Sequence, residues 1–378
     1  MPLAFVVALG GAACSSPASH VPAAPGASTA PAAGTPDVVR AHTVCFAGPP
    51  AGWSRSFADH SLGVSGGLGF DVGAVSEDGG MAFGHYRSAT EQGVGAVALA
   101  GGALSRIAPL PAGAAGIGSM SAAGPWVVWE QAESSTDLGD WSVRAWSRDT
   151  TEALVLATSH LPDGGSAFGE MPLPVVRRGV VAWAQPQARH TSHPEATVQL
   201  YDLGRRRATV LDTGRVSGPV FAGPYVVWAR VAADESFSLR AVDAVTLRPA
   251  PLPDRARSPG SVRYLAGSAR YLAWSSGQQR LTVWRLGSNE YDEYTTDLRH
   301  PLQFLQLAGD FVLWYAGYPS SVLDLRTGRA FDVRGSVAGS DALIALSEPA
   351  RPPATKTEIV PARLSYAPLS AATRIDSC

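Results

Sequence analysis

Charged residues are scarce in this chain. Asp, Glu, Lys and Arg make up 16% of the 378 residues, and Lys356 is the only lysine. The formal net charge is −2, so the chain lacks the excess of basic residues that binding to a phosphate backbone requires. We therefore expect no nucleic-acid partner. At 46% hydrophobic residues, the chain can still bury a large core.

Apolar runs long enough to cross a bilayer are also lacking. The run Leu3–Ala13 is too short for a membrane span and is typical of a secretory signal. Cys14 follows it directly, and GAAC resembles a bacterial lipobox, in which the cysteine is lipidated and becomes the first residue of the mature protein. Gly11 replaces the usual branched aliphatic residue, and no Lys or Arg precedes the run. An ordinary cleaved signal and a buried apolar terminus are the alternatives to a lipoprotein signal over residues 1–14.

The next segment has no apolar periodicity. Residues 15–37 are dominated by Ala, Pro, Ser, Thr and Gly, a composition typical of flexible linkers. We predict a disordered tether over residues 15–43 and a folded domain over residues 44–378. A tether behind a lipidated cysteine indicates an extracytoplasmic protein that is held to the membrane by its N-terminal lipid alone, with a secreted protein as the alternative.

Only three cysteines occur. If Cys14 carries lipid, Cys45 and Cys378 remain, and an even number in an oxidising compartment predicts a disulfide between them. Two unpaired buried thiols are the alternative.

One short phrase recurs along the chain. It combines a turn residue, often glycine, with an apolar run that usually ends in tryptophan, and its seven copies are spaced about 30–55 residues apart, around the period of propeller blades. The copies are DGGMAFG (Phe83), GPWVVWE (Trp129), GVVAWAQ (Trp183), GPYVVWAR (Trp228), SARYLAWSS (Trp274), GDFVLWYA (Trp314) and SDALIALS (Ala345).

The surroundings of each copy predict four short strands. A small-residue segment precedes the phrase, and two strand-like runs separated by turn residues follow it. With no convincing helical periodicity between them, seven such units predict an all-β propeller of seven four-stranded blades. Six blades are the alternative, because the last copy is degenerate.

The apolar run fits a strand that neighbouring blades cover on both faces. We therefore assign the tryptophans to the blade core, where they fill the gaps between blades. A ring of aromatic side chains around a ligand is the competing interpretation. These residues are Trp129, Trp183, Trp228, Trp274 and Trp314.

SEDGGMAFGHYR, followed by GVGAVALAGGALSRI, resembles the TolB-type repeat, in which a Ser-Pro-Asp-Gly turn precedes a short apolar strand. Ser76, Asp78 and Gly79 reproduce that turn, and Glu77 replaces its proline. The resemblance extends over about residues 64–375. It implies a propeller that binds other envelope proteins and performs no chemistry.

Propeller rings are commonly closed when N- and C-terminal strands share one blade. We predict that Thr43–Phe46 lies beside Ala371–Ile375, which would bring Cys45 near Cys378.

Catalytic signals are few. GVSGG satisfies the G-x-S-x-G pattern at Ser65, but a nucleophile elbow needs a strand before the serine and a helix after it. His190 and His193, with Glu195 nearby, form an H-x-x-H without an evident third ligand, and Pro194 opposes helical geometry. We therefore predict a flexible loop at Ser65 and solvent-exposed histidines, with no catalytic residue, metal or cofactor.

Arginines cluster in the third repeat. A solvated charge run at a hairpin tip is the ordinary interpretation, and an anion-binding lip for cell-wall phosphate or lipid headgroups is the alternative. The residues are Arg177, Arg178, Arg205, Arg206, Arg207 and Arg215.

Two functions remain from the sequence. The first is a monomeric, membrane-anchored scaffold without catalytic activity that binds another envelope protein or a cell-wall component. The second is an exported propeller enzyme, a glycosidase or lyase, that acts on an extracellular polysaccharide with carboxylates gathered over the central channel. Asp71, Glu77 and Asp78 are the first candidates for that role, although turn and capping roles suit them as well.

Overall fold

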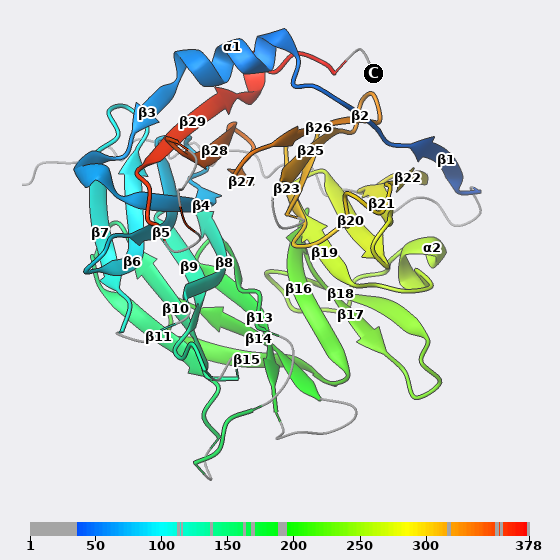
Figure 1. The fold of residues 1–378 in the computed structure, drawn as a ribbon. Helices are drawn as coiled ribbons and strands as arrows, with labels where there is room; N and C mark the ends of the chain where they lie inside the picture. The colour runs from blue at the N-terminus through cyan, green and yellow to red at the C-terminus, as the bar shows by residue number, and fades with distance from the viewer. Residues whose placement is uncertain are drawn as a thin grey trace, which may run out of the picture.

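The computed structural model describes residues 36–111, 114, 116–136, 139–161, 164–167, 171–187, 195–315, 319–351, 355 and 358–375. Seven β-sheets are arranged as the blades of a propeller (Figure 1). The predicted all-β, seven-bladed fold is confirmed, and the six-bladed alternative is wrong. Within the described ranges, no helix has the length and apolar character needed to cross a membrane.

The first strand of each blade lies innermost, and the others follow outward. Blade 1 contains β4 (Gly69–Val75), β5 (Met81–Arg87), β6 (Gln92–Ala98) and β7 (Leu104–Pro109). Blade 2 contains β8 (Gly116–Ala123), β9 (Trp126–Ala132), β10 (Trp141–Ser147) and β11 (Ala153–Thr158). Blade 3 contains β12 (Val175–Arg177), β13 (Val180–Pro186), β14 (Ala196–Asp202) and β15 (Arg207–Gly214). Blade 4 contains β16 (Val216–Ala222), β17 (Tyr225–Val231) and β18 (Phe237–Asp243).

The remaining blades include strands from the N-terminal segment. Blade 5 contains β19 (Tyr264–Gly267), β20 (Tyr271–Ser276), β21 (Arg280–Arg285), β22 (Glu290–Thr295) and β1 (Val38–Thr43). Blade 6 contains β23 (Gln306–Ala308), β24 (Phe311–Tyr315), β25 (Ser320–Asp324), β26 (Arg329–Val333) and β2 (Cys45–Ala47). Blade 7 contains β27 (Ser336–Gly339), β28 (Leu343–Pro349), β29 (Ala362–Pro368) and β3 (Ser61–Gly63). The helices are α1 (Ala51–Asp59), α2 (Asp254–Arg257) and the 3₁₀ turns η1 (Ser65–Gly67) and η2 (Leu369–Ala371).

All seven copies of the recurring phrase lie in the second strand of a blade, namely β5, β9, β13, β17, β20, β24 and β28. The glycine ahead of the run makes the turn from the first strand. Gly124 and Gly223, for example, have φ values of 56° and 55°, a left-handed conformation that suits glycine. The run is apolar because adjacent blades cover both faces of this strand.

The five tryptophans of the phrase lie in the core. Each is at most 4% exposed, and each belongs to a buried cluster that joins neighbouring blades. Their side chains are therefore not available as an exposed aromatic ring around a ligand. They are Trp129, Trp183, Trp228, Trp274 and Trp314.

Blade 4 departs from the predicted four strands, because the chain after β18 forms no fourth strand. Isolated bridges join Val242 to Pro249 and Phe237 to Gly260, and α2 lies between them in sequence. Leu252 and Ala256 are buried in the cluster that contains Leu239 of β18. An irregular segment thus covers β18 in place of a paired strand.

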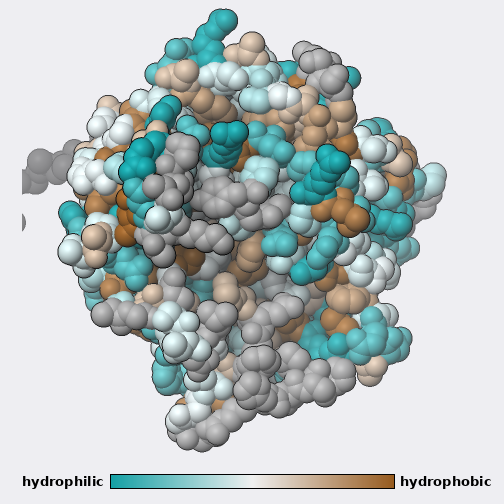
Figure 2. All heavy atoms as spheres, viewed as in Figure 1, coloured by the Kyte–Doolittle hydropathy of each residue, from teal (hydrophilic) through white to brown (hydrophobic). Residues whose placement is uncertain are grey.

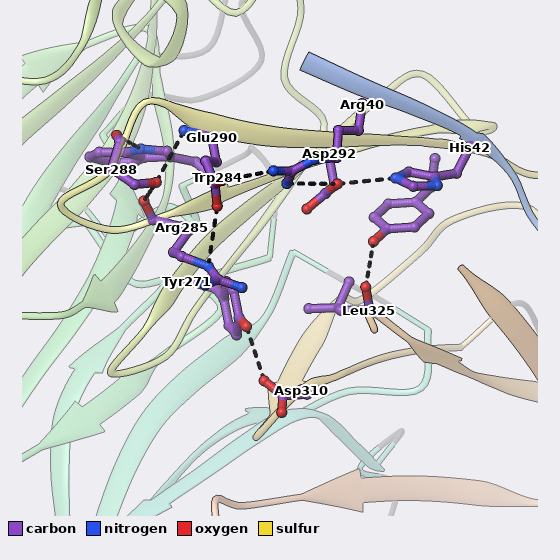
Figure 3. A network of polar contacts seen from close by, with 11 residues as sticks. Arg40, His42, Tyr271, Trp284, Arg285, Ser288, Glu290, Asp292, Asp310 and Leu325 are labelled. Carbon is purple, nitrogen blue, oxygen red and sulfur yellow. Dashed lines mark hydrogen bonds and ion pairs between the residues drawn. The ribbon is translucent and has the colours of Figure 1, made fainter. Parts of the chain in front are cut away.

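The N-terminal segment runs along the outside of three successive blades. β1 pairs in parallel with β22 and β2 in parallel with β26, and β3 then completes blade 7 by pairing antiparallel with β29 (Figure 1). We call residues 38–63 the belt. Its first strand is held by side-chain contacts as well as by the backbone: Arg40 lies 2.7 Å from Glu290, and His42 lies 3.0 Å from Asp292 (Figure 3).

The C-terminal segment meets the belt at α1. The indole Nε1 of Trp53 donates to the carbonyl oxygen of Thr373 at 2.8 Å, and Trp53 is completely buried against Phe311 and Phe331. The backbone N–H of Ile375 approaches Asp324 Oδ2 at 3.4 Å. The belt at α1 and the described C-terminal segment are therefore held together beside blades 6 and 7.

The structure corrects two predicted boundaries. The predicted tether extends to residue 43, whereas Val38–Thr43 already form β1, because a partner strand is available at the edge of blade 5. The blade shared by both termini is closed by Ser61–Gly63 against β29, and not by Thr43–Phe46 beside Ala371–Ile375. Cys45 lies in β2, whereas Cys14 and Cys378 lie outside the described residues.

Candidate binding site

Ser65 has a structural role and is not placed as a nucleophile. It begins the three-residue η1, and its hydroxyl oxygen accepts a hydrogen bond from the backbone N–H of Leu104 at 2.9 Å. The strand β4 follows, and not the helix that a nucleophile elbow requires. The side chain thus fixes the segment before blade 1 to the β6–β7 turn.

The three candidate carboxylates are not gathered at one place. Asp71 is near the start of β4, whereas Glu77 and Asp78 are in the turn after its end, about 13 Å or more away along the strand. Asp78 accepts from Ser76 Oγ at 2.5 Å and from the backbone N–H of Gly80 at 3.0 Å. These bonds lower the pKa of Asp78 to about 2.

Glu77 connects two blades. Its Oε2 accepts from the backbone N–H of Gly124, in the β8–β9 turn, at 3.0 Å. The Ser-Glu-Asp-Gly turn therefore stabilises itself through Asp78 and the neighbouring blade through Glu77. These are the turn and capping roles that the sequence left open beside catalysis.

Asp71 lies in a different setting, next to other titratable groups. Arg87 Nη2 is 2.5 Å from Asp71 Oδ2, and burial is the main cause that raises the pKa of Asp71. Asp71 also pairs across the strands with His85, whose pKa burial lowers to about 4. In blade 2, burial raises the pKa of Glu130 to about 7. Burial keeps both His85 and Glu130 predominantly uncharged near pH 6.

The histidine pair of the sequence cannot be placed. His190 and His193 lie outside the described residues, and Glu195 directly precedes β14. In the part of the chain that the structure describes, no group of three His, Cys, Asp or Glu side chains could hold a metal ion.

A groove lies between blades 3 and 4, on the face that carries the turns between first and second strands. Its volume is about 650 Å³, which is in the range of small-molecule sites. It runs from the end of the innermost strand β12 outward to the β14–β15 turn and to the segment after β18. We call it the 3–4 groove. Its lining residues are Arg177, Arg178, Val180, Leu200, Asp202, Arg205, Arg207, Thr209, Phe221, Gly223, Pro224, Ala244, Val245 and Leu247.

The charge of the 3–4 groove is strongly positive. Its lining holds four arginines and a single acid, Asp202, which pairs with Arg205 at 2.8 Å. Arg178 and Arg207 make no ion pair with any residue that the structure describes. Burial, followed by the charge of Arg178, lowers the pKa of Arg177. An anion in the groove would therefore relieve repulsion between guanidinium groups.

The remainder of the lining is mostly apolar. Phe221 and Leu200 are buried in the cluster between the two blades, whereas Val245 is 81% exposed and Leu247 is 37% exposed. The turns around the groove are tight, and Arg178 and Leu247 have φ values of 48° and 58°. Such left-handed conformations are uncommon for side chains of this size and hold both residues at the rim.

The arginine cluster of the sequence is therefore divided. Arg177, Arg178, Arg205 and Arg207 line the groove, but Arg206 is 3.4 Å from Glu152 and Arg215 pairs with Glu235. Sequence reasoning missed the apolar wall, because Phe221, Val245 and Leu247 belong to the next repeat. Their only signal is that each lies in or beside a predicted turn or strand end.

Figure 2 views one face of the molecule from the same side as Figure 1. Among the described residues of that face, hydrophilic and hydrophobic side chains alternate over short distances (Figure 2). Isolated apolar residues of this kind are normal on a soluble protein.

No family model matches the chain, and no curated protein matches it by sequence. Solved structures do. An oligogalacturonate lyase from Vibrio parahaemolyticus is 10% identical over 81% of this chain and 92% of its own, with a TM-score of 0.51. A chain of the mitotic checkpoint complex is 13% identical over 87% of this chain and 99% of its own, with a TM-score of 0.50.

TolB from Acinetobacter baumannii also matches, at 11% identity over 61% of this chain and 58% of its own, with a TM-score of 0.38. At such identities, the similarities concern the fold alone. The seven-bladed ring confirms the β-propeller fold that the repeats indicated.

Proposed function

We propose that this protein is an exported, lipid-anchored β-propeller that binds an envelope protein or a cell-wall component and has no catalytic role. The observation that carries the proposal is the 3–4 groove, which combines an apolar wall and exposure to solvent with two arginines, Arg178 and Arg207, that make no ion pair with a described residue. Such a surface is suited to recognition, since it offers directional donors beside apolar area.

The environment of the candidate carboxylates supports a binding role over an enzymatic one. Glu77 and Asp78 are engaged in turn contacts at one end of β4, and Asp71 is paired with Arg87 near the other end. General acid–base catalysis by two carboxylates needs both groups within reach of one substrate bond. Asp71 and Asp78 do not share such a position.

The first test is capture of the partner. The anchored protein is crosslinked in its own cell envelope, purified, and its companions are identified by mass spectrometry, with the variant Val245→Asp as a matched comparison. One dominant partner that is lost with Val245→Asp supports the binding role. Recovery of the protein alone, or with glycan only, would favour the enzymatic alternative instead and direct attention to Asp71.

The anchor is tested separately. Cys14 is the proposed lipidation site, and residues 15–37 are the proposed tether. We expect Cys14→Ala to move the protein from the membrane fraction to the soluble extracytoplasmic fraction, without a change in its thermal unfolding. A variant that stays with the membrane would contradict lipid anchoring at Cys14.

We also propose the Cys45–Cys378 disulfide. The backbone of Ile375 contacts Asp324 in β25. Asp324 lies opposite Arg329 in β26, and Arg329 lies opposite Cys45 in β2. Cys45 is therefore two strand spacings, about 10 Å, from Asp324. Three residues after Ile375 can span about 10 Å, so the chain length allows the bond. A count of two free thiols in the unfolded, unreduced mature protein would contradict it.

A further inference from the structure

From the charge and shape of the 3–4 groove, we infer that its ligand is an organophosphate, namely a phosphate group attached to an aliphatic or aromatic body. This inference rests on the proposed binding role and names the chemistry of the ligand. It concerns one cavity and does not require the partner to be a protein.

The charge balance favours phosphate over a neutral or singly charged group. The lining of the groove contains four arginines and one acidic residue, Asp202, which is paired with Arg205. Arg178 and Arg207 come from different strands and turns, and neither is neutralised by another described residue. A phosphate monoester dianion carries about two negative charges on three terminal oxygens and can accept from two guanidinium groups at once, whereas a carboxylate carries one charge on two oxygens.

The position of Arg177 sharpens this assignment. One of its Nη atoms donates to the carbonyl oxygen of Gly223, which bridges the first turns of blades 3 and 4. This bond fixes one guanidinium at the inner end of the groove, whereas the rim arginines Arg178 and Arg207 keep their donors available among the described residues. The hydrogen-bond donors for a phosphate are therefore Arg178 and Arg207 at the rim. Arg177, at the inner end of the groove, adds a positive charge.

The apolar wall specifies the remainder of the ligand. Inorganic phosphate would leave the exposed side chains of Val245 and Leu247 in contact with water. A hydrocarbon body attached to the phosphate would cover it, and about 25 cal/mol is gained for each Å² of apolar surface removed from water. The cavity of about 650 Å³ accommodates a body of several carbon atoms beside the phosphate.

The test uses the purified full chain and three probes measured by isothermal titration calorimetry. Octyl phosphate combines both features, inorganic phosphate has only the charge, and octyl glucoside has only the hydrocarbon chain. We expect octyl phosphate to bind at least about tenfold more tightly than either of the others, since each lacks one set of contacts. We also expect its affinity to fall with rising salt.

Variants locate the site. Arg178→Ala with Arg207→Ala is expected to weaken octyl phosphate at least about tenfold, because two charge-assisted hydrogen bonds are lost. Arg206→Ala is the matched control, since Arg206 lies on the same turn but points to Glu152 and does not line the groove. Val245→Asp alters a largely exposed side chain, so it should fold normally and repel the phosphate.

Two results would overturn the inference. The first is equal affinity for octyl phosphate and octyl glucoside. The second is octyl phosphate binding that survives in the double arginine variant. If either occurs while partner capture remains sensitive to Val245→Asp, the binding role stands and only the ligand chemistry is wrong.

Discussion

The two halves of the ring are completed in different ways. Blades 5, 6 and 7 receive the belt, whose strands cover or complete their outer edges, whereas blade 4 receives no fourth strand and is covered by an irregular segment with α2. On the first strand of the belt, Arg40 is neutralised, since it lies 2.7 Å from Glu290 and 3.9 Å from Asp292 (Figure 3). In the 3–4 groove, Arg178 and Arg207 have no acidic partner among the described residues.

This difference indicates that the belt stabilises the ring, whereas the 3–4 groove is suited to binding a ligand. Chain segments that are distant in sequence must pack together to close the ring, so their charges and aromatic side chains are matched. The boundary of blades 3 and 4 joins two consecutive repeats and involves neither of the terminal segments. Unmatched charge costs less there, and it remains available for a ligand.

The largest expected effect concerns the belt. Trp53→Ala would remove a completely buried indole from between α1, Phe311 and Phe331, and the free energy of unfolding should fall by about 3–5 kcal/mol. Urea denaturation measures it. Val245→Ala in the groove is the comparison and should change stability by less than about 0.5 kcal/mol. Equal losses in the two variants would remove the distinction between the halves.

The proposed disulfide gives the next effect. If Cys45 and Cys378 are joined, Cys45→Ser should lower the free energy of unfolding by about 2–5 kcal/mol under oxidising conditions. Under reducing conditions, the variant and the wild type should then have nearly equal stabilities. A difference that persists after reduction would indicate that Cys45 acts by packing alone.

A third prediction concerns a buried acid outside the belted half. The pKa of Glu130 is raised from 4.5 to about 7, so the folded state keeps a proton that the unfolded state loses. Stability from this group is complete below pH 4.5 and falls by about 3 kcal/mol as the pH rises through 7. Relative to Glu130→Gln, the wild type should lose that amount across this range in unfolding experiments.

His85 provides the control of opposite sign. Its pKa falls from 6.5 to about 4, so its contribution is present above pH 6.5 and is lost as the pH falls through 4. The difference between wild type and His85→Gln should therefore shrink toward acid. Parallel curves for the Glu130 and His85 variants would contradict the assignment of both groups to buried, uncharged states.

The smallest effect is a single hydrogen bond in the belted half. The hydroxyl of Tyr271 donates to Asp310 at 2.9 Å, and Tyr271→Phe should cost about 1 kcal/mol (Figure 3). Tyr225→Phe in blade 4 is the matched control, because its hydroxyl makes no hydrogen bond within the described residues. Thermal unfolding of both variants checks the comparison, and a larger loss for Tyr225→Phe would contradict it.

Repeated local patterns made most of the fold predictable. Each apolar run with its preceding turn specifies a second strand by itself, so Trp129 and Trp228 indicated their strands without reference to the rest of the chain. Segments with a single occurrence were missed. The nine residues of α1 have too few turns for a clear periodicity, and the six residues of β1 have no counterpart among the repeats.

The candidate site was predictable only in part. The sequence showed arginines close together near Arg205, but it could not separate Arg207, which lines the groove, from Arg206, which points to Glu152. Adjacent residues in a turn project in different directions, and that choice depends on the neighbouring blade. The sequence also could not show that the candidate carboxylates lie apart. Most of β4 separates Asp71 from Asp78.

By itself, the sequence determined the all-β class, the seven repeats and the apolar second strands, because these depend on local alternation, turn residues and burial on two faces. Only the tertiary structure decided where residues 38–63 run, how blade 4 ends and which arginines share a groove. Those features depend on contacts between segments up to 320 residues apart, such as Trp53 with Thr373, and no local pattern encodes them.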